Sequence, residues 1–337
     1  MGVKMGQVRI DVVIPTYKPD KQFVELMEGL KKQTIRPSRI IIMNTEEKYF
    51  NILMYGTRFK EDFPNVEIKH ISQREFNHGK TRNEGAKRSD AQILIFMTQD
   101  SVPADEFMIE ELIKPMVDTD VAATYARQLP NDDCRPIEKF TRLYNYPDHD
   151  RVQDKSKIGE LGIKTYFCSN VCAAYKRYVF DELGGFINFT IFNEDMLFAA
   201  KAVEADKKIV YTSKAKVIHS HNYSGKQQFK RNFDLAVSQA DHKEIFEHVP
   251  SEGEGIRLVK ETIAYLKEEK KSYLIAELFY KSACKLLGYK LGYNYHKLTK
   301  RMIYSFTMNQ PYWERYWDKK QIPIDVHAGY GKNKEGL

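Results

Sequence analysis

The chain has 337 residues, of which 42% are hydrophobic and 29% are charged, and it carries a formal net charge of +7. This composition excludes a disordered or fibrous protein, and the length allows one large domain with an appendage or two modest domains. The basic excess fits anionic partners such as nucleotide diphosphates, nucleic acid or anionic lipid, and it does not choose among them.

The sequence gives no sign of a secretion signal or a membrane span, since no run approaches the ~20 apolar residues that a spanning helix requires. We therefore expect a cytoplasmic protein. The spacing of Cys168 and Cys172 does not match a zinc knuckle, so we expect these two cysteines, with Cys134 and Cys284, to be reduced and packed as small apolar groups. The segment 329–337 is expected to fray.

The first half of the chain alternates strand and helix patterns. Strands are predicted over Val8–Ile14, where Pro15 ends the run, and over Arg39–Met43, Val66–Ile71, Ile93–Met97 and Val121–Tyr125. Helices are predicted over Asp20–Gln33, Thr81–Arg88 and Asp105–Val117. This order predicts an α/β fold, a Rossmann-like and mostly parallel sheet with helices on both faces.

The second half is less regular. Residues 128–163 are polar and predict long loops with one helix around Glu138–Tyr144. An apolar stretch, helices and short strands follow, at Tyr166–Tyr175, Lys176–Leu183, Asn193–Ala205, Lys208–Thr212 and Val217–Ile218. Beyond Phe246 the pattern is helical, over Ile256–Lys270, Tyr273–Leu291 and Leu298–Met308. We expect a main domain over residues 1–245 and a helical region over residues 246–337.

The ends of the predicted strands are the first places to look for a site, because ligands of open α/β sheets bind beyond the carboxyl ends of strands. The fourth strand is followed by Thr98, Gln99 and Asp100. A carboxylate in this place can hold a cation such as Mg²⁺ over a phosphate. The alternative is an aspartate that caps the following helix.

A pair of carboxylates, Glu194 and Asp195, opens a predicted helix. Acidic residues at a helix N-terminus stabilise the helix by ~0.3–1 kcal/mol, which is the structural interpretation. The functional interpretation is a general base, which can remove the proton of an attacking hydroxyl.

Two histidines, His219 and His221, stand at alternate positions of an extended segment. Alternate side chains of a strand point the same way, so both imidazoles can face one site. Imidazole is a common ligand of divalent metals. A structural role is the alternative.

The combination of these motifs resembles the family-2 glycosyltransferases, which have the GT-A fold, over about residues 8–245. The resemblance implies that Pro15, Thr16 and Tyr17 flank the nucleotide base. It implies that Asp100 contacts Mg²⁺ or Mn²⁺ and the diphosphate, with His219 or His221 completing that site. It also implies that Asp195 is the catalytic base and that Glu194 stands beside it.

A narrower resemblance is to bacterial rhamnosyltransferases of this family. It rests on the blocks Arg74–Asn83, Thr98–Pro103 and Glu194–Ala199. In the first block Lys80 and Arg82 offer cations to a diphosphate, and Gly79 permits close approach of the backbone. Hydrogen bonds to the donor are expected from Asn77, His78, Asn83 and Gln99. The alternative is an ordinary loop that caps a helix.

Two departures from the family pattern concern the donor site. Asn44 and Glu46 stand where many relatives have an aspartate for the base or ribose, and Thr98 replaces the first aspartate of an Asp-x-Asp motif. We expect Asn44 and Glu46 to bind the nucleotide, and we expect modest metal affinity. Ser169 and Asn170 fall where relatives line the sugar and acceptor pocket.

The stretch 281–301 carries six basic residues, Lys281, Lys285, Lys290, Lys297, Lys300 and Arg301, with interleaved leucines and tyrosines and no acid. A basic amphipathic helix with aromatic residues can lie on an anionic membrane surface. The alternatives are a helical cap with a solvated basic face and a contact in a homodimer. No nucleic-acid-binding module is recognisable, so we expect no nucleic-acid partner.

From the resemblance we expect an inverting glycosyltransferase that moves L-rhamnose from dTDP-β-L-rhamnose to a glycan or lipid-linked glycan acceptor in bacterial surface-polysaccharide synthesis. It would be cytoplasmic or peripheral on the inner face of the cell membrane. One alternative is the same chemistry with a UDP-hexose donor. The other is a non-catalytic protein that binds a nucleotide sugar or a glycan.

Overall fold

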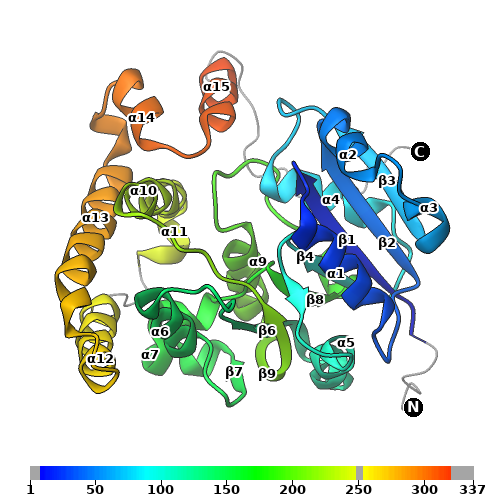
Figure 1. The fold of residues 1–337 in the computed structure, drawn as a ribbon, viewed down its shortest axis with the longest axis horizontal. Coiled ribbons are helices and arrows are strands. Elements are labelled where there is room, and N and C mark those ends of the chain that lie inside the picture. The colour runs from blue at the N-terminus through cyan, green and yellow to red at the C-terminus, as the bar shows by residue number, and fades with distance from the viewer. Residues whose placement is uncertain (1–7, 248–252, 320–337) are drawn as a thin grey trace.

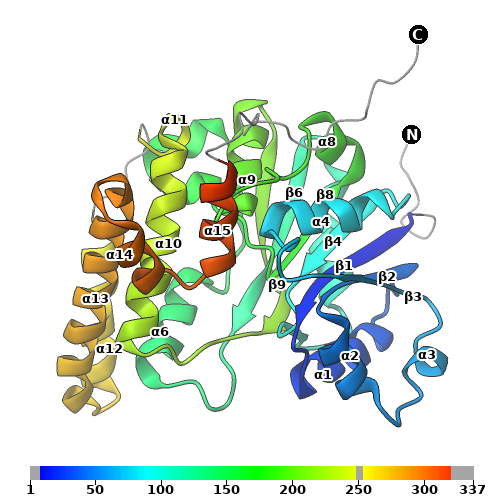
Figure 2. The same cartoon turned by 90° about the horizontal axis from the view of Figure 1, so that it is seen from above.

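The computed structural model describes residues 8–247 and 253–319, and the segment 329–337 that we expected to fray lies outside them. One mixed sheet runs through the described part with helices on both faces, and a group of C-terminal helices stacks against one side (Figure 1; Figure 2). The predicted α/β class with a helical C-terminal region is confirmed.

The first half of the sheet is parallel. β1 (Ile10–Tyr17) lies between β2 (Arg39–Thr45) and β4 (Ile93–Met97), and β3 (Val66–Ile71) pairs with β2 at the edge. β1, β2 and β4 are buried at nearly every position, as strands covered on both faces are, whereas the edge strand β3 is half-exposed. β3 and β4 begin and end where the sequence predicts.

The second half of the sheet is mixed. The strand β8 (Cys172–Lys176) comes from the predicted apolar stretch and runs antiparallel to β4 and to β6 (Val121–Leu129). β9 (Lys208–Ile218) is parallel to β6, and two short strands, β5 (Val102–Pro103) and β7 (Arg151–Gln153), pair with β9. Because β8 is antiparallel to β4, β8 begins beside the carboxyl end of β4, and the residues just before β8 lie there too.

Several predicted strand ends are wrong. β2 continues past Met43 to Thr45 and β6 continues past Tyr125 to Leu129, and the errors in β1 and β9 have clear causes. β1 does not stop at Pro15 but continues to Tyr17, because its pairing with β4 ends at Val13 and only β2 pairs with it beyond that point. A residue without an N–H is tolerated where one side of the strand is unpaired. β9 is one strand and not two, because a bulge opposite Ala126 and Arg127 absorbs the polar residues that interrupt the pattern.

Helices cover the two faces of the parallel half with separate apolar cores. One face carries α1 (Lys21–Lys31), α2 (Glu47–Met54), the short α3 (Phe59–Asp62) and α5 (Met108–Ile113), and the other carries α4 (His78–Lys87), α8 (Arg177–Glu182) and α9 (Glu194–Glu204). In α1 the side chain of Asp20 accepts a hydrogen bond from the N–H of Gln22, and the predicted apolar face is buried. Cys168 and Cys172 are buried, as predicted.

The polar middle contains short elements between its loops. α6 (Pro136–Asn145) includes the predicted helix, and α7 (Ile158–Leu161) is a single turn that the sequence pattern did not show. α11 (Lys243–Phe246) is a further single turn.

The longest error of the sequence prediction is α10 (Gly225–Asp241), a helix of 17 residues that was not predicted. Its first half is so polar that the helical period of its apolar residues is hard to see. One signal was present, since Ser224 and Gln227 form a capping box, with each side chain bonded to the other residue's backbone N–H.

The C-terminal helices are α12 (Glu254–Glu268), α13 (Ile275–Tyr293), α14 (Lys300–Phe306) and α15 (Gln310–Lys319). α13 packs against α10 (Figure 2), and a Cβ added at Gly288 or Gly292 would stand 2.2 Å from a carbonyl oxygen of α10. Trp313 of α15 is fully buried in a core that includes Ile191 and Phe233. Among the described helices none is long and apolar enough to cross a bilayer.

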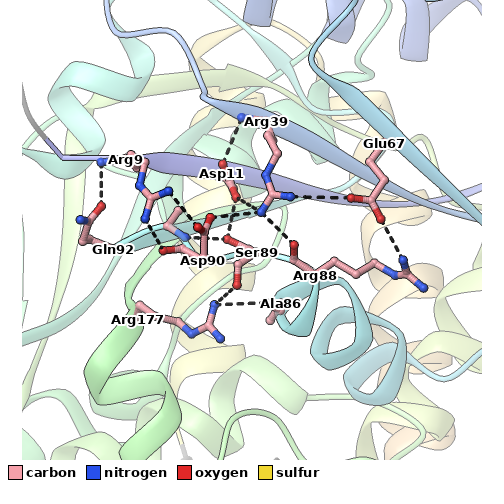
Figure 3. Close-up of polar contacts among 11 residues, drawn as sticks. Arg9, Asp11, Arg39, Glu67, Ala86, Arg88, Ser89, Asp90, Gln92 and Arg177 are labelled. Carbon is pink, nitrogen blue, oxygen red and sulfur yellow. Dashed lines mark hydrogen bonds and ion pairs between the residues drawn. The ribbon is translucent and has the colours of Figure 1, made fainter.

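A polar network joins the amino ends of β1, β2 and β4 (Figure 3). The carboxylate of Asp11 is 1% exposed and accepts hydrogen bonds from the Ser89 hydroxyl at 2.7 Å, the Arg39 backbone N–H at 3.0 Å and the Arg39 guanidinium at 3.2 Å. Arg39 also contacts the exposed Asp90 at 3.3 Å. The network lies at the edge of the sheet opposite the carboxyl ends of these strands.

We predict that Asp11→Ala lowers the free energy of unfolding by roughly 2–4 kcal/mol, because it leaves a buried hydroxyl, an N–H and a guanidinium without their acceptor. Urea denaturation followed by circular dichroism measures this change. Asp90→Ala is the matched control in the same network, and we expect a much smaller effect because the Asp90 side chain is 68% exposed. Equal unfolding midpoints for the two variants would contradict the importance of the buried carboxylate.

Candidate functional site

Most of the residues singled out in the sequence gather where the parallel and antiparallel halves of the sheet meet. Asp100 lies in the turn after β4, and the N–H of Thr98 in the same segment donates to the carbonyl oxygen of Val171, just before β8. His219 and His221 follow the end of β9, and Asp195 lies in the first turn of α9.

Asp100, His219 and His221 form a cluster in which one ligand atom from each residue lies within 4.8 Å of the others. Oδ2 of Asp100 is 3.3 Å from Nε2 of His221 and 3.6 Å from Nε2 of His219. Burial lowers the pKa of both imidazoles, that of His221 to about 4, so both rings are neutral at neutral pH. Burial alone would raise the pKa of Asp100, but its contacts with His219 and Thr98 hold it below its ordinary value.

This donor set fits a divalent metal, because a carboxylate and two neutral imidazoles supply three lone pairs at one point. The other nitrogen of His219, Nδ1, lies 3.0 Å from Oε1 of Gln128 at the end of β6. That contact favours the tautomer that leaves Nε2 free for a metal. The amide of Gln128 therefore orients the buried histidine.

Gln128 also links the cluster of Asp100, His219 and His221 to Asp195. Its Nε2 donates to the Tyr146 hydroxyl at 2.6 Å and to the Ser169 hydroxyl at 3.0 Å. The residue after Ser169 is Asn170, whose backbone N–H donates to Oδ2 of Asp195 at 2.9 Å. Asp100 and Asp195 are nearly a hundred positions apart in the chain. They are thus connected in space through His219, Gln128 and the segment of Ser169 and Asn170.

Asp195 has the properties of a group that exchanges protons near neutral pH. Its Oδ1 accepts from the N–H of Met196 at 2.9 Å, in addition to the bond from Asn170. Burial, followed by the negative charge of Glu194, raises the pKa of Asp195 to about 7. A carboxyl group in this range can take a proton from a substrate hydroxyl and release it again.

Glu194 has a different environment. It forms a buried ion pair with Arg82, in which Nη1 of Arg82 and Oε1 of Glu194 are 3.0 Å apart and the two side chains are 5% and 8% exposed. Although burial alone would raise the pKa of Glu194, the charges of Arg82 and His78 and a hydrogen bond from Asn170 lower it. Glu194 is therefore held by Arg82 and Asn170 directly beside Asp195.

The block Arg74–Asn83, which leads into α4, packs against the segment before α9. The Asn77 side chain caps α4 by accepting from the N–H of Gly79 at 3.2 Å. Asn83 makes two hydrogen bonds with the backbone of Phe186, at 2.7 and 3.0 Å. A Cβ at Gly79 would stand 1.9 Å from the carbonyl oxygen of Ile187.

The expectation that Asn77, Gly79, Arg82 and Asn83 contact the donor directly is therefore corrected. All four are buried, and they hold the segment that leads to Asp195 against α4. The exposed Lys80 lines a separate hollow with Lys69, Glu75 and Glu84, and is not gathered with Asp100. His78 lines a cavity with Tyr17 and Phe192, and burial lowers its pKa.

The end of β1 is clamped beside the metal cluster. The N–H of Tyr17 donates to Oε1 of Gln99 at 2.8 Å, and Nε2 of Gln99 donates to the carbonyl of Tyr17 at 3.1 Å. The ring of Tyr17 is 37% exposed and meets Tyr49 edge-on, with ring centroids 5.6 Å apart. Pro15 is half-buried. Gln99 thus acts through Tyr17, and the Tyr17 ring is available to a ligand.

Three further predicted donor residues have partners within the protein. The Thr16 hydroxyl donates to Oδ1 of the buried Asn44 at 2.9 Å, and Nδ2 of Asn44 lies 2.9 Å from Nδ1 of His70. Oε1 of Glu46 accepts from the N–H of Gln73 at 2.8 Å. The side chains of Thr16 and Asn44 tie β1 to β2 below the surface, which corrects the expectation that they contact the nucleotide.

The sequence prediction missed four residues of the site: Gln128, Arg142, Tyr146 and Arg231. A guanidinium nitrogen of Arg142 donates to Oε1 of Gln128 at 2.5 Å. Arg231 lies on α10, so it could not be placed without that helix. No local signal marks Gln128 or Tyr146, because their roles depend on partners far away in the chain.

Comparisons with known proteins identify the family of the sequence and proteins of similar fold. The sequence profile described as "Glycosyl transferase family 2" matches residues 11–184. The chain is 37% identical over 319 residues to the O-antigen chain rhamnosyltransferase RfbN of Salmonella typhimurium, which covers 94% of this chain and 100% of that protein. It is 36% identical over 318 residues to the O-antigen chain rhamnosyltransferase WbaN of Salmonella anatum, which covers 92% and 98%.

Among solved structures, the fold is similar to that of the mannosyltransferase PcManGT from Pyrobaculum calidifontis, solved in complex with GDP-Man and Mn²⁺. The TM-score is 0.54 at 14% identity, over 94% of this chain and 88% of that one. At this identity the likeness concerns the fold, which is the GT-A fold of glycosyltransferases. Asp195, His219, His221 and Arg231 lie beyond the residues that the family profile matches.

We predict that the cluster binds Mn²⁺ and that His219→Ala combined with His221→Ala weakens this binding by about 100-fold or more, because two of three protein ligands are lost. Isothermal titration calorimetry with Mn²⁺ measures the affinity. His149→Ala is the control, since the His149 side chain is 73% exposed. Unchanged Mn²⁺ affinity in the double variant would place the metal elsewhere.

Proposed function

Since the chain belongs to glycosyl transferase family 2 and is a glycosyltransferase, we propose that it transfers L-rhamnose from dTDP-β-L-rhamnose to a hydroxyl of a glycan or lipid-linked glycan, with inversion. Two relatives named as O-antigen chain rhamnosyltransferases support the sugar and the pathway, because the alignments span almost the whole of all three chains. Asp195 carries the chemical part of the proposal, since it is a carboxyl with a pKa near 7 linked through Gln128 to a metal-ligand cluster.

We propose that Asp195 is the general base. Its carboxylate takes the proton of the acceptor hydroxyl as that oxygen bonds to the anomeric carbon of rhamnose. The bond from that carbon to the diphosphate breaks on the opposite face, and the electron pair leaves with dTDP. Asn170, through its N–H to Asp195, holds the carboxylate in place, and Glu194 and Arg82 fix the start of α9.

On the donor side, Asp100, His219 and His221 are the proposed ligands of the cation. A bound divalent metal would offset the negative charge of the departing nucleotide diphosphate. Two of the three donors are imidazole nitrogens, which favours Mn²⁺ over Mg²⁺. Pro15 and the exposed ring of Tyr17 are the proposed contacts to the nucleotide base, and Ser169 lies between the two halves of the site. We propose residues 1–245 as the catalytic domain.

We predict that Asp195→Asn lowers kcat by at least about 10³-fold while the affinity for dTDP-rhamnose stays within about threefold, because the amide cannot accept the proton but keeps the shape. In the wild type, kcat/KM should rise with pH through about 7, since only the ionised Asp195 is a base. Release of dTDP from dTDP-rhamnose in the presence of an acceptor glycan measures turnover.

Glu194→Gln tests the electrostatic cause of this profile. Removal of the neighbouring negative charge lowers the pKa of Asp195, so the acid limb of the profile should move to lower pH. Full activity of Asp195→Asn would contradict the catalytic assignment. Binding of dTDP-rhamnose without turnover, by wild type and variant alike, would favour the non-catalytic alternative, and turnover of UDP-glucose alone would favour the UDP-hexose alternative.

The outer face of α13 carries exposed apolar side chains that can contact a further partner. Phe279, Tyr280, Leu286 and Leu287 recur with helical spacing and are each 54–59% exposed, and Tyr273 just before α13 is 77% exposed. Residues 278–313 contain no aspartate or glutamate. Of the six basic residues named above, Lys281 is buried and pairs with Glu277 and Glu138, so it does not belong to an exposed basic face, which corrects the expectation for this residue. We propose that this apolar stripe lies on the anionic inner face of the cell membrane, where a lipid-linked acceptor would be found.

We predict that Leu286→Asp combined with Leu287→Asp reduces binding to vesicles of phosphatidylglycerol and phosphatidylcholine by about tenfold or more, because two apolar side chains lose their lipid contact. Flotation of the vesicles measures the bound fraction. Ile52→Asp is the control, since Ile52 is 72% exposed on α2. A particle of twice 39.5 kDa by light scattering, which the leucine variants alone convert to monomer, would instead assign the stripe to a homodimer.

A further inference from the structure

α10 brings Arg231 to the site. No acidic group among the described residues forms an ion pair with this arginine. The guanidinium of Arg231 lies 4.8 Å from the centroid of the Phe192 ring and 5.6 Å from that of Tyr223. Within the described part of the chain it has no hydrogen-bond acceptor and no ion-pair partner. Stacking between two rings holds the guanidinium in place and leaves its N–H groups for another molecule.

Arg231 lies in the wall of a cavity. It lines a cavity of about 300 Å³ together with Tyr17 after β1, His78 of α4, Phe192 before α9, and Asn309 from the C-terminal helices. The walls of this cavity therefore come from both ends of the chain. They include the exposed ring that we propose for the nucleotide base and the segment that leads to Asp195.

The nearby carboxyl of Asp234 does not serve as the partner of Arg231. It accepts a hydrogen bond from the Thr307 hydroxyl at 2.6 Å and one from the N–H of Met308 at 2.8 Å. Burial raises the pKa of Asp234 to about 7, so this group does not supply a full negative charge at neutral pH. The carboxyl of Asp234 is therefore engaged with the segment between α14 and α15, and not with Arg231.

Arg231 also lies close to the metal cluster. The rings of His221 and Tyr223 have centroids 5.0 Å apart, and Tyr223 is in turn beside Arg231. A second arginine of the site, Arg142, donates to Gln128 and stands over the Tyr146 ring, so it is already engaged.

We propose that Arg231 binds a diphosphate in this cavity, beside the metal cluster. A planar guanidinium offers two parallel N–H groups, which match two oxygens of a phosphate. The diphosphate has two sources in the proposed reaction, the donor nucleotide and a lipid-linked acceptor. The inference rests on the proposed function, and it adds a binding residue from a helix outside the part of the chain that the family profile matches.

The test compares diphosphate affinity of the full chain and its variants by calorimetry, with dTDP and with geranyl diphosphate, each with and without Mn²⁺. We expect Arg231→Gln to weaken binding of the relevant diphosphate by about 10- to 100-fold, because a charge-assisted hydrogen bond is lost. Arg231→Lys should recover only part of the diphosphate affinity, since lysine restores the positive charge without the two parallel N–H groups of the guanidinium. Arg257→Gln is the control, because Arg257 pairs with Glu261 on the surface of α12.

A loss confined to dTDP assigns Arg231 to the donor, and a loss confined to geranyl diphosphate assigns it to the acceptor. Equal affinity of wild type and Arg231→Gln for both ligands overturns the inference. If Arg231→Gln unfolds at a lower temperature than wild type, the comparison is made with Arg231→Lys. A wild type that binds UDP and not dTDP contradicts the proposed donor, and the Arg231 comparison is then made with UDP.

Discussion

The buried ion pair between Arg82 and Glu194 is the constraint on which the site depends. It joins α4 to the first residue of α9, and both side chains are almost fully buried. Two charges taken out of water are expensive unless they remain together, so this pair fixes the distance between the two helices. Glu194 keeps its negative charge because of Arg82, and that charge in turn raises the pKa of its neighbour Asp195. Two adjacent carboxyl groups thus acquire opposite properties from their surroundings.

The reversal of strand direction at β8 explains why the two halves of the site meet. The carboxyl end of β4 delivers Asp100, and the segment entering β8 delivers Ser169 and Asn170 to the same edge. Gln128 at the end of β6 then connects His219 with Ser169. The proposed metal ligands follow strands of one sheet, and the proposed base, Asp195 of α9, is bonded to the segment that enters a strand of the same sheet. This arrangement gives the site the rigidity that precise chemistry needs.

The C-terminal helices are part of the same unit. Gly288 and Gly292 allow α13 to lie against the backbone of α10, and Trp313 is buried in a core shared with Ile191. Because Ile191 lies a few residues before Asp195, this core supports the segment that carries the proposed base. The outer face of α13 is free of such packing among the described residues, which separates a supporting inner face from an exposed apolar one.

The sequence by itself determined the strands of the parallel half and the family resemblance, and it singled out Asp100, Asp195, His219 and His221, which the fold brings to one region. Each of these signals is local: an apolar run, or a polar group at the end of an element. Only the tertiary structure decided that Arg82, Asn83 and Gly79 face inward. The composition of a block rich in arginine, glycine and asparagine does not distinguish a loop that binds phosphate from a segment that packs against another loop inside the protein. The roles of Gln128 and Arg231 also required the fold, since each is defined by partners that come close only when the sheet and α10 assemble.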